Sequence, residues 1–549
     1  MLNKLRTICI IVLITTLYFQ TYGQKVDKSY DYTKKIKPEE EVFYLIFPRS
    51  FYDSNGDQIG DLNGITEKLD YLQELGVTSI IMTPLYPSIY YHNYFTHDFE
   101  GIDEEFGSKK DYLNMVREIH RKGMKFYMDT EVQYVTEEHP WFKNSYKNPA
   151  SEYSDYIFYK DSLNNDPVPI IFDLKGLKSY DGNYLDIARV NLYNKRVRKY
   201  VYDLFAYWVD PNEDGKFDDG VDGFRLDHTM DNLDNKNLLT NMLKDFWKPL
   251  IINSKKINPD LKFIAEQSDW DKPGWIDPAY DIFEKAGIDL AYSFDHMFSI
   301  SDKEKFESTI NTELIKTPAG KYFFLFLDLH DTDRFASKPG WNTDLNKQKA
   351  AMIYLSKGIP LIYYGQEIGM KGTRLNESLL EPSDTLNDGY DIPKREAFEW
   401  AKNINSRGMA TWFRDVQPYW YNRNIVSDDG ISVEEQNSDN NSLLNFYRKL
   451  LIFRKTNSAF TTGNIQVISN SNKSVFTYCR FDKDSKFLLA FNFAKETATT
   501  NILTETLPFE IINDSIDMVL GNSVSSFNYS ENTLAVTLEG NGFAIIKLK

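Results

Sequence analysis

Asp219 to His228 reads Asp-Gly-Val-Asp-Gly-Phe-Arg-Leu-Asp-His, and this stretch decides the fold. A turn rich in glycine and aspartate leads into a short apolar strand. Alternation along the strand sends the side chains of Arg225 and Asp227 to one face and their apolar neighbours to the other. An arginine beside an aspartate favours the ionised carboxylate, which is the form that a carboxylate nucleophile needs. A structural ion pair would look the same, so other residues must decide between the two interpretations.

Short apolar segments alternate with helical patterns on both sides of this stretch. Residues 62–75 have apolar residues at helical spacing, and similar patterns follow most of the apolar segments. Such alternation implies a parallel sheet, and eight strands predict an α/β fold of the (β/α)8 TIM-barrel type. An open doubly wound sheet is the alternative, but no glycine-rich phosphate loop follows any strand. The expected strands are Glu41–Phe47, Thr78–Met82, Lys125–Asp129, Gly223–Asp227, Leu261–Glu266, Asp289–Phe294, Tyr322–Leu329 and Pro360–Tyr364.

Two further regions depart from the barrel pattern. The segment 130–193 is rich in Tyr, Asn, Asp and Pro and is long for a loop, so we expect an inserted subdomain after the third strand. Near the C-terminus, short alternating strands predict a separate antiparallel β-sandwich domain. The expected organisation is a signal peptide at 1–23, a leader at 24–40, the catalytic barrel at 41–456 and the β domain at 457–549.

The N-terminus and the composition limit where the protein works. A basic start, an apolar run and Gly23 are typical of a secretory signal peptide, which predicts export to the periplasm or the medium.

The formal net charge of −17 argues against nucleic acid and anionic membranes as partners. Cys9 lies in the signal, which leaves Cys479 without an intrachain disulfide partner. We expect a monomer or a weak oligomer.

Three acids follow expected strands and would meet above the barrel. Asp227 and Glu266 end their strands, and Asp331 lies just beyond another. Strand ends of a barrel converge on one pocket, so these carboxyls suit glycoside hydrolysis with retention. Asp227 would attack the anomeric carbon, Glu266 would act as acid and then base, and Asp331 would bind sugar hydroxyls. Burial and neighbouring carboxylates would raise the pKa of Glu266 as the acid role requires.

The chain resembles the alpha-amylase family, glycoside hydrolase family 13. The resemblance runs in order from about 41 to 456, and residues 394–400 are most similar to members between neopullulanases and oligo-1,6-glucosidases. The motifs that carry it are Tyr-Leu-Ile-Phe-Pro-Arg-Ser-Phe-Tyr at 44–52, Gly-Asp-Leu-Asn-Gly-Ile at 60–65, Gly-Phe-Arg-Leu-Asp at 223–227, His-Asp-Thr-Asp-Arg-Phe at 330–335 and Ile-Tyr-Tyr-Gly-Gln-Glu-Ile-Gly-Met at 362–370.

The resemblance implies a barrel, a domain inserted after strand three, a C-terminal β domain and retaining action on α-glucosidic bonds. It assigns the roles of nucleophile, acid and base, and transition-state stabiliser to the same three acids. Arg225, His330, Tyr94 and Arg334 are then expected to bind the substrate. Five positions depart from the family pattern and concern the sugar sites: Gln133 and Tyr134 replace Asn-His, Asp231 replaces a histidine, Leu329 an asparagine and Phe95 an aspartate.

Two loops have acids at alternate positions. In the first, a tight turn can direct hard oxygens at one Ca²⁺, and the family resemblance covers this loop, so we expect calcium there. Its ligands would be the side chains of Asp53, Asn55, Asp57 and Asp61 and the carbonyl of Ile59. The second loop, 210–218, is explained equally well by a second cation and by a solvated turn.

The sequence thus predicts an exported α-glucan hydrolase that acts on starch-derived oligosaccharides or polysaccharide. Because the sugar-site positions are altered, a transglycosylase or a hydrolase of another α-linked glycan is the nearest alternative. A weakly active glycan-binding relative is a third, although pure binding needs no nucleophile and acid pair.

Overall fold

A computed structural model describes residues 35–266, 277–376, 386–511 and 516–548. They fall into two compact units, one of Tyr32–Tyr354 with Gly358–Asn445 and the other of Leu355–Lys357 with the chain from Phe446 onward. The expected signal peptide lies outside the described residues, as does most of the leader. Among the described residues, no helix has the length and apolar character needed to cross a membrane.

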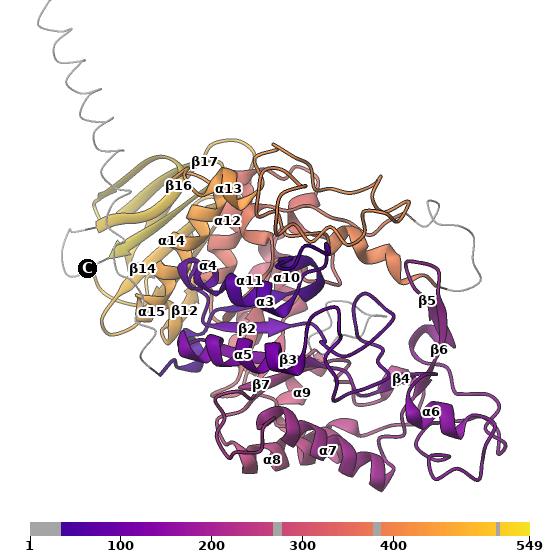
Figure 1. Cartoon of the computed structure of the whole chain (residues 1–549). Coiled ribbons are helices and arrows are strands. Elements are labelled where there is room, and N and C mark those ends of the chain that lie inside the picture. The colour runs from indigo at the N-terminus through magenta and orange to yellow at the C-terminus, as the bar shows by residue number, and fades with distance from the viewer. Residues whose placement is uncertain (1–34, 267–276, 377–385, 512–515, 549) are drawn as a thin grey trace, which may run out of the picture. The chain divides into compact units, whose positions relative to one another are not determined.

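The first unit contains a closed barrel of eight parallel strands, which confirms the predicted fold. Going round the barrel, the order is β1, β11, β10, β9, β8, β7, β3 and β2, and Figure 1 shows β2, β3 and β7 side by side. The strands are β1 (Phe43–Ile46), β2 (Ser79–Met82), β3 (Lys125–Thr130), β7 (Gly223–Leu226), β8 (Lys262–Ala265), β9 (Leu290–Tyr292), β10 (Tyr322–Leu325) and β11 (Ile359–Tyr363).

Helices separate these strands along the chain. The helix expected at 62–75 is divided at Lys68, whose backbone leaves the helical range and whose ammonium lies over the rings of Tyr52 and Trp400. The helices of this unit include α2 (Pro48–Phe51), α3 (Leu62–Glu67), α4 (Leu69–Leu75), α5 (Lys109–Arg121), α7 (Lys195–Val209), α8 (Lys248–Ile257), α9 (Asp277–Lys285), α10 (Phe294–Ser299), α11 (Lys303–Lys316), α12 (Thr343–Tyr354) and α13 (Val433–Gln436).

Strand β10 is shorter than the sequence predicts. It ends at Leu325, whereas the apolar pattern continues to Leu329. The reason lies in Asp328, which is buried and accepts a hydrogen bond from the backbone N–H of Phe335. This contact turns the chain back and places residues 330 and 331 beyond the strand end.

The inserted segment forms a small subdomain of its own. Its sheet has the order β4 (Tyr134–Thr136), β6 (Tyr184–Arg189) and β5 (Gly176–Lys178), and α6 (Pro140–Ser145) precedes the last two strands. A small apolar cluster that includes Tyr90, Leu177 and Ile187 joins this sheet to the loop that follows β2. The subdomain therefore has a fixed position beside the carboxyl ends of the barrel strands.

The second unit is the predicted antiparallel domain. Its sheet has the order β12 (Asn464–Val467), β13 (Val475–Phe481), β14 (Lys486–Asn492), β17 (Thr533–Leu548) and β15 (Ala498–Leu503), and β16 (Ile516–Ser530) pairs with β17. The two ends of β17 pair with different neighbours, residues 533–538 with β15 and residues 543–548 with β14, and register shifts interrupt its pairing with β16. One apolar core draws residues from these strands and includes the buried Cys479. Helices α14 (Leu443–Lys455) and α15 (Ser458–Thr461) precede the sheet.

Candidate active site

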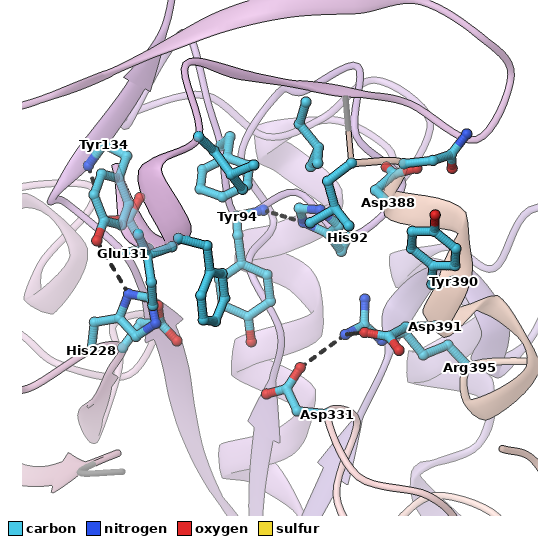
Figure 2. A pocket seen from close by; sticks show the side chains of 18 of the residues that line it. His92, Tyr94, Glu131, Tyr134, His228, Asp331, Asp388, Tyr390, Asp391 and Arg395 are labelled. Carbon is cyan, nitrogen blue, oxygen red and sulfur yellow. Dashed lines mark hydrogen bonds and ion pairs between the residues drawn. The ribbon is translucent and has the colours of Figure 1, made fainter. Parts of the chain in front are cut away.

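The three acids predicted to converge line one cavity at the carboxyl end of the barrel. Figure 2 shows this cavity with Asp331 labelled. Asp227 directly follows β7 and Glu266 directly follows β8, while Asp331 lies in the turn beyond β10. The cavity has a volume of about 360 Å³. Two groups of charged residues surround it, and they shift the pKa values of their carboxyls in opposite directions.

The first group, which we call the Arg225 wall, consists of Arg225, Asp129, Asp227 and Glu266. Nη1 of the buried Arg225 donates to Asp129 Oδ1 at 2.9 Å and to Asp227, and Nη2 lies 3.1 Å from Glu266 Oε2. One guanidinium thus serves three carboxyls. Burial raises the pKa of Glu266 to about 8, with Arg225 opposing and Asp227 adding to the effect. Burial likewise raises the pKa of Asp129 to about 6.

The second group, the Arg395 wall, consists of His330, Asp331, Asp391, Lys394 and Arg395. Asp331 Oδ2 lies 3.0 Å from His330 Nε2, and its Oδ1 accepts from Arg395 Nη2 at 2.9 Å. Lys394 donates to the carbonyl of Asp331 and also pairs with Asp391. Although burial acts in the other direction, His330 and Arg395 hold the pKa of Asp331 well below its usual range. This carboxyl is an anion whenever the enzyme is folded at neutral pH.

Tyr94 connects the two walls. Its hydroxyl donates to Asp129 Oδ2 at 2.7 Å and lies 2.8 Å from His330 Nε2, and its ring stacks on the His330 ring. Tyr94 lines the cavity, whereas His330 and Arg225 lie behind the lining. Their influence on a sugar would therefore pass mainly through Tyr94 and the three acids.

Arg334, which was expected to bind substrate, lies elsewhere. It is fully buried, donates to the carbonyls of Lys394 and Tyr364, and stacks on the rings of Tyr363 and Tyr364. It is not among the residues that line the cavity. The structure places it as a support for the chain that carries Lys394 and Arg395.

The positions that depart from the family pattern are spread over several environments. Phe95 and Tyr134 line the cavity, while Asp231 and Leu329 do not. The Tyr134 hydroxyl donates to Asp234 Oδ1 at 2.5 Å, and the Gln133 amide donates to the Asp227 carbonyl at 2.7 Å. Phe95 packs its ring edge against Tyr134. The Gln133 amide therefore holds the backbone at Asp227, and the Tyr134 hydroxyl holds the side chain of Asp234.

Sequence reasoning missed several cavity residues. Arg395 was quoted only within a motif, and nothing in its local pattern shows that it pairs with Asp331, 64 residues earlier. Glu131 follows β3 closely, so its place just beyond a strand end was the available signal. The missed ionisable residues that line the cavity are His92, Glu131, His228, Arg374, Asp388, Tyr390, Asp391, Lys394 and Arg395.

The expected calcium loop has oxygen donors of the right kind. Asp53 accepts hydrogen bonds from the backbone amides of Gly56 and Gln58, and Asp61 accepts one from Ser54. Among the described residues, no Lys or Arg forms an ion pair with Asp53, Asp57 or Asp61, so a cation would balance uncompensated charge. However, no three Asp, Glu, His or Cys side chains in the described ranges converge tightly enough to hold a metal. Calcium at this loop stays a prediction.

Comparisons with known proteins show the family to which the chain belongs. The family model "Alpha amylase, catalytic domain" matches residues 45–463. The chain is 29% identical to alpha-amylase 3 of Dictyoglomus thermophilum, covering 93% of this chain and 94% of that protein. It is 28% identical to an oligo-1,6-glucosidase of Bacillus cereus, covering 93% and 99%. The crystal structure of the alpha-amylase from H. orenii superposes with a TM-score of 0.73 at 25% identity, covering 92% and 99%. The chain therefore belongs to the alpha-amylase family of glycosidases.

Proposed function

We propose that this protein is a retaining glycosidase that hydrolyses α-glucosidic bonds in starch-derived oligosaccharides. Asp227 is the nucleophile, Glu266 is the acid and base, and Asp331 stabilises the transition state. The observation that carries this assignment is the shared guanidinium of Arg225, which holds Asp227 and Glu266 on its two terminal nitrogens. Retaining enzymes keep their two carboxyls about 5 Å apart, whereas inverting enzymes need about 6.5–9.5 Å to admit a water molecule.

The reaction needs one carboxyl ionised, that of Asp227, and one protonated, that of Glu266. The Asp227 carboxylate attacks the anomeric carbon while protonated Glu266 transfers its proton to the departing glycosidic oxygen, so the C–O bond breaks with a neutral leaving group. The Glu266 carboxylate then takes a proton from water, whose oxygen attacks the same carbon and releases Asp227. Asp331 stays ionised throughout, so it can accept hydrogen bonds from sugar hydroxyls, and its negative charge stabilises the oxocarbenium-like transition state.

The cavity supports a short neutral glycan as substrate. Its volume of about 360 Å³ lies in the usual range of small-molecule sites, roughly 300–1,000 Å³. Apolar side chains of Phe95, Leu174 and Leu177 face its charged walls, and sugars present both apolar faces and hydroxyls. The names of the relatives, among them oligo-1,6-glucosidases of several Bacillus species, favour oligosaccharides with α-1,6 or α-1,4 bonds.

The decisive experiment is product analysis with maltoheptaose, pullulan and panose. We expect the mature protein to release defined shorter glucans, and Asp227→Asn to lose at least about a thousandfold in kcat/KM because no covalent intermediate can form. The α-anomer should appear first by NMR. Asp222→Asn is the matched control, since Asp222 lies at the opposite end of β7 and pairs with His120. Release of the β-anomer, or equal loss in both variants, would overturn the assignment.

Export and calcium binding are further parts of the proposal. If Ca²⁺ occupies the loop at 53–61, chelation should lower Tm by several degrees, because a ligand that binds only the folded state stabilises it. Asp57→Asn should lower Tm and make it insensitive to chelator. Asp214→Asn in the second loop is the control, and a loss of chelator sensitivity there would move the site to 210–218.

A further inference from the structure

Glu131 is a fourth acid of the cavity with no role in the reaction above. It follows β3, is 1% exposed and lines the cavity beside Asp227 and Glu266. Its Oε1 accepts hydrogen bonds from the backbone N–H of Gln133 and, at 3.1 Å, from that of Tyr134. Its Oε2 is buried and has no hydrogen-bond partner among the described residues. A buried polar atom at a cavity wall without a partner is costly unless a ligand supplies one.

The neighbouring polar groups are already engaged. The Tyr134 hydroxyl donates to Asp234, which also binds the buried Arg189, and Figure 2 shows the Tyr134 hydroxyl turned towards His228. The Gln133 amide donates to the carbonyl of Asp227. Thus the hydroxyl of Tyr134 and the amide of Gln133 are both engaged with protein groups, whereas Glu131 Oε2 is not.

The contacts also show which oxygen carries a proton. Oε1 receives two N–H donors, so it acts as the carbonyl-like acceptor. Burial, together with the nearby charge of Asp227, raises the pKa of Glu131 well above its usual range. The raised pKa favours the neutral acid, and because Oε1 already accepts two N–H donors, a proton on this acid belongs on Oε2, where it is available as a donor.

We propose that Glu131 is a sugar-binding residue whose Oε2–H donates a hydrogen bond to a ring hydroxyl of the glucose unit held against Asp227. The inference rests on the proposed function, because it needs a sugar in this cavity. It identifies a neutral carboxylic acid as the donor on the β3 side of the cavity. A site that hydrogen-bonds one substrate hydroxyl discriminates strongly against analogues that lack it.

The test combines two variants with deoxy substrates. Glu131→Gln keeps an acceptor for the turn and a donor for the sugar, so kcat/KM should stay within a few-fold of the parent. Glu131→Met keeps the length and removes both functions, so kcat/KM should fall about tenfold or more. Both variants are assayed on panose or maltotriose and on analogues without the 2-, 3- or 6-hydroxyl of the transferred glucose.

The analogues separate sugar binding from a merely structural role. If Glu131 binds one hydroxyl, removing that hydroxyl should slow the parent and Glu131→Gln but cause no further loss in Glu131→Met. Asp328 is a matched control, since it is equally buried, accepts one backbone N–H and has one oxygen without a partner, but lies outside the cavity lining. Any loss in Asp328→Leu should be the same for every analogue.

Two results would overturn the inference, and they are distinguishable from failure of the proposed function. If Glu131→Met loses the same factor on all analogues, the side chain only supports the turn. If Glu131→Met equals the parent on every substrate, it has no role. If the parent cleaves none of the glucans, the proposed function itself fails, and the inference fails with it.

Discussion

The Arg225 wall and the Arg395 wall both contain buried carboxyl groups, but they shift the pKa values of these groups in opposite directions. In the Arg225 wall, one cation is shared by three buried carboxyls, and the pKa of Glu266 rises to about 8. In the Arg395 wall, Asp331 contacts both His330 and Arg395, and its pKa stays well below the usual range. Both carboxyls are buried, so the difference comes from the groups that contact each one: Glu266 shares the Arg225 guanidinium, whereas Asp331 contacts both His330 and Arg395.

This difference assigns the two walls different tasks. A carboxyl that is still protonated near neutral pH can give a proton to a leaving group. One that is firmly ionised can stabilise positive charge on a sugar ring. Three measurements test whether the walls differ as described.

The largest effect should come from Glu266→Gln. With a poor leaving group such as a sugar, kcat/KM should fall about a thousandfold, because general acid catalysis typically contributes 10²–10⁴-fold. With an acidic phenol as leaving group, the variant should keep much of its rate. The parent should lose activity above pH about 8 as Glu266 ionises, and the variant should lack this alkaline limb. A variant that retained the limb would show that another group of the cavity is the acid.

A smaller loss is expected when the Arg395 wall loses a cation. Arg395→Met removes the partner of Asp331 Oδ1, so the pKa of Asp331 should rise and the acid limb of kcat/KM should move to higher pH. The rate should fall about a hundredfold, as for other charge-stabilising groups. Arg395→Lys should recover part of both effects. An unchanged acid limb in Arg395→Met would show that His330 alone keeps Asp331 ionised.

The smallest effects concern stability, and they should have opposite signs. The folded pKa of Glu266 is raised, so its ionisation disfavours the folded state increasingly as pH rises from its unfolded value towards 8. The folded pKa of Asp331 is lowered, so its contribution is present above the unfolded value and is lost as pH falls. At pH 8, Glu266→Gln should raise Tm and Asp331→Asn should lower it, each by about 1–3 °C. Equal signs would contradict the contrast between the walls.

Much of the fold was predictable because strands and helices depend on local periodicity. All eight expected strands are present, and Asp227 and Glu266 follow theirs directly. The end of β10 was predicted four residues late because the apolar pattern continues beyond it. Beyond the strand, the contact of Asp328 with the Phe335 amide and the hydrogen bonds between Leu329 and Thr332 hold a turn, and no local pattern encodes the first of these.

The candidate site was predictable only in part. The three acids could be found because a barrel brings strand ends together. The cations that keep Asp331 ionised could not be found in this way, since Arg395 lies in a segment outside the regular pattern of barrel strands and helices. For Glu131, the sequence signal was only its place just beyond a strand end, and the folded structure is needed to show that the Tyr134 hydroxyl and the Gln133 amide are engaged elsewhere.

The contacts of Arg395 also determine when, during its synthesis, this enzyme becomes active. Arg395 donates to Tyr91, 304 residues earlier in the chain, and β1 closes the barrel by pairing with β11. At a typical 5–20 residues per second, the first barrel strand waits on the order of tens of seconds for the last. A nascent chain that stops short of residue 395 has all three acids but not this partner of Asp331, so hydrolytic activity should appear only late in translation.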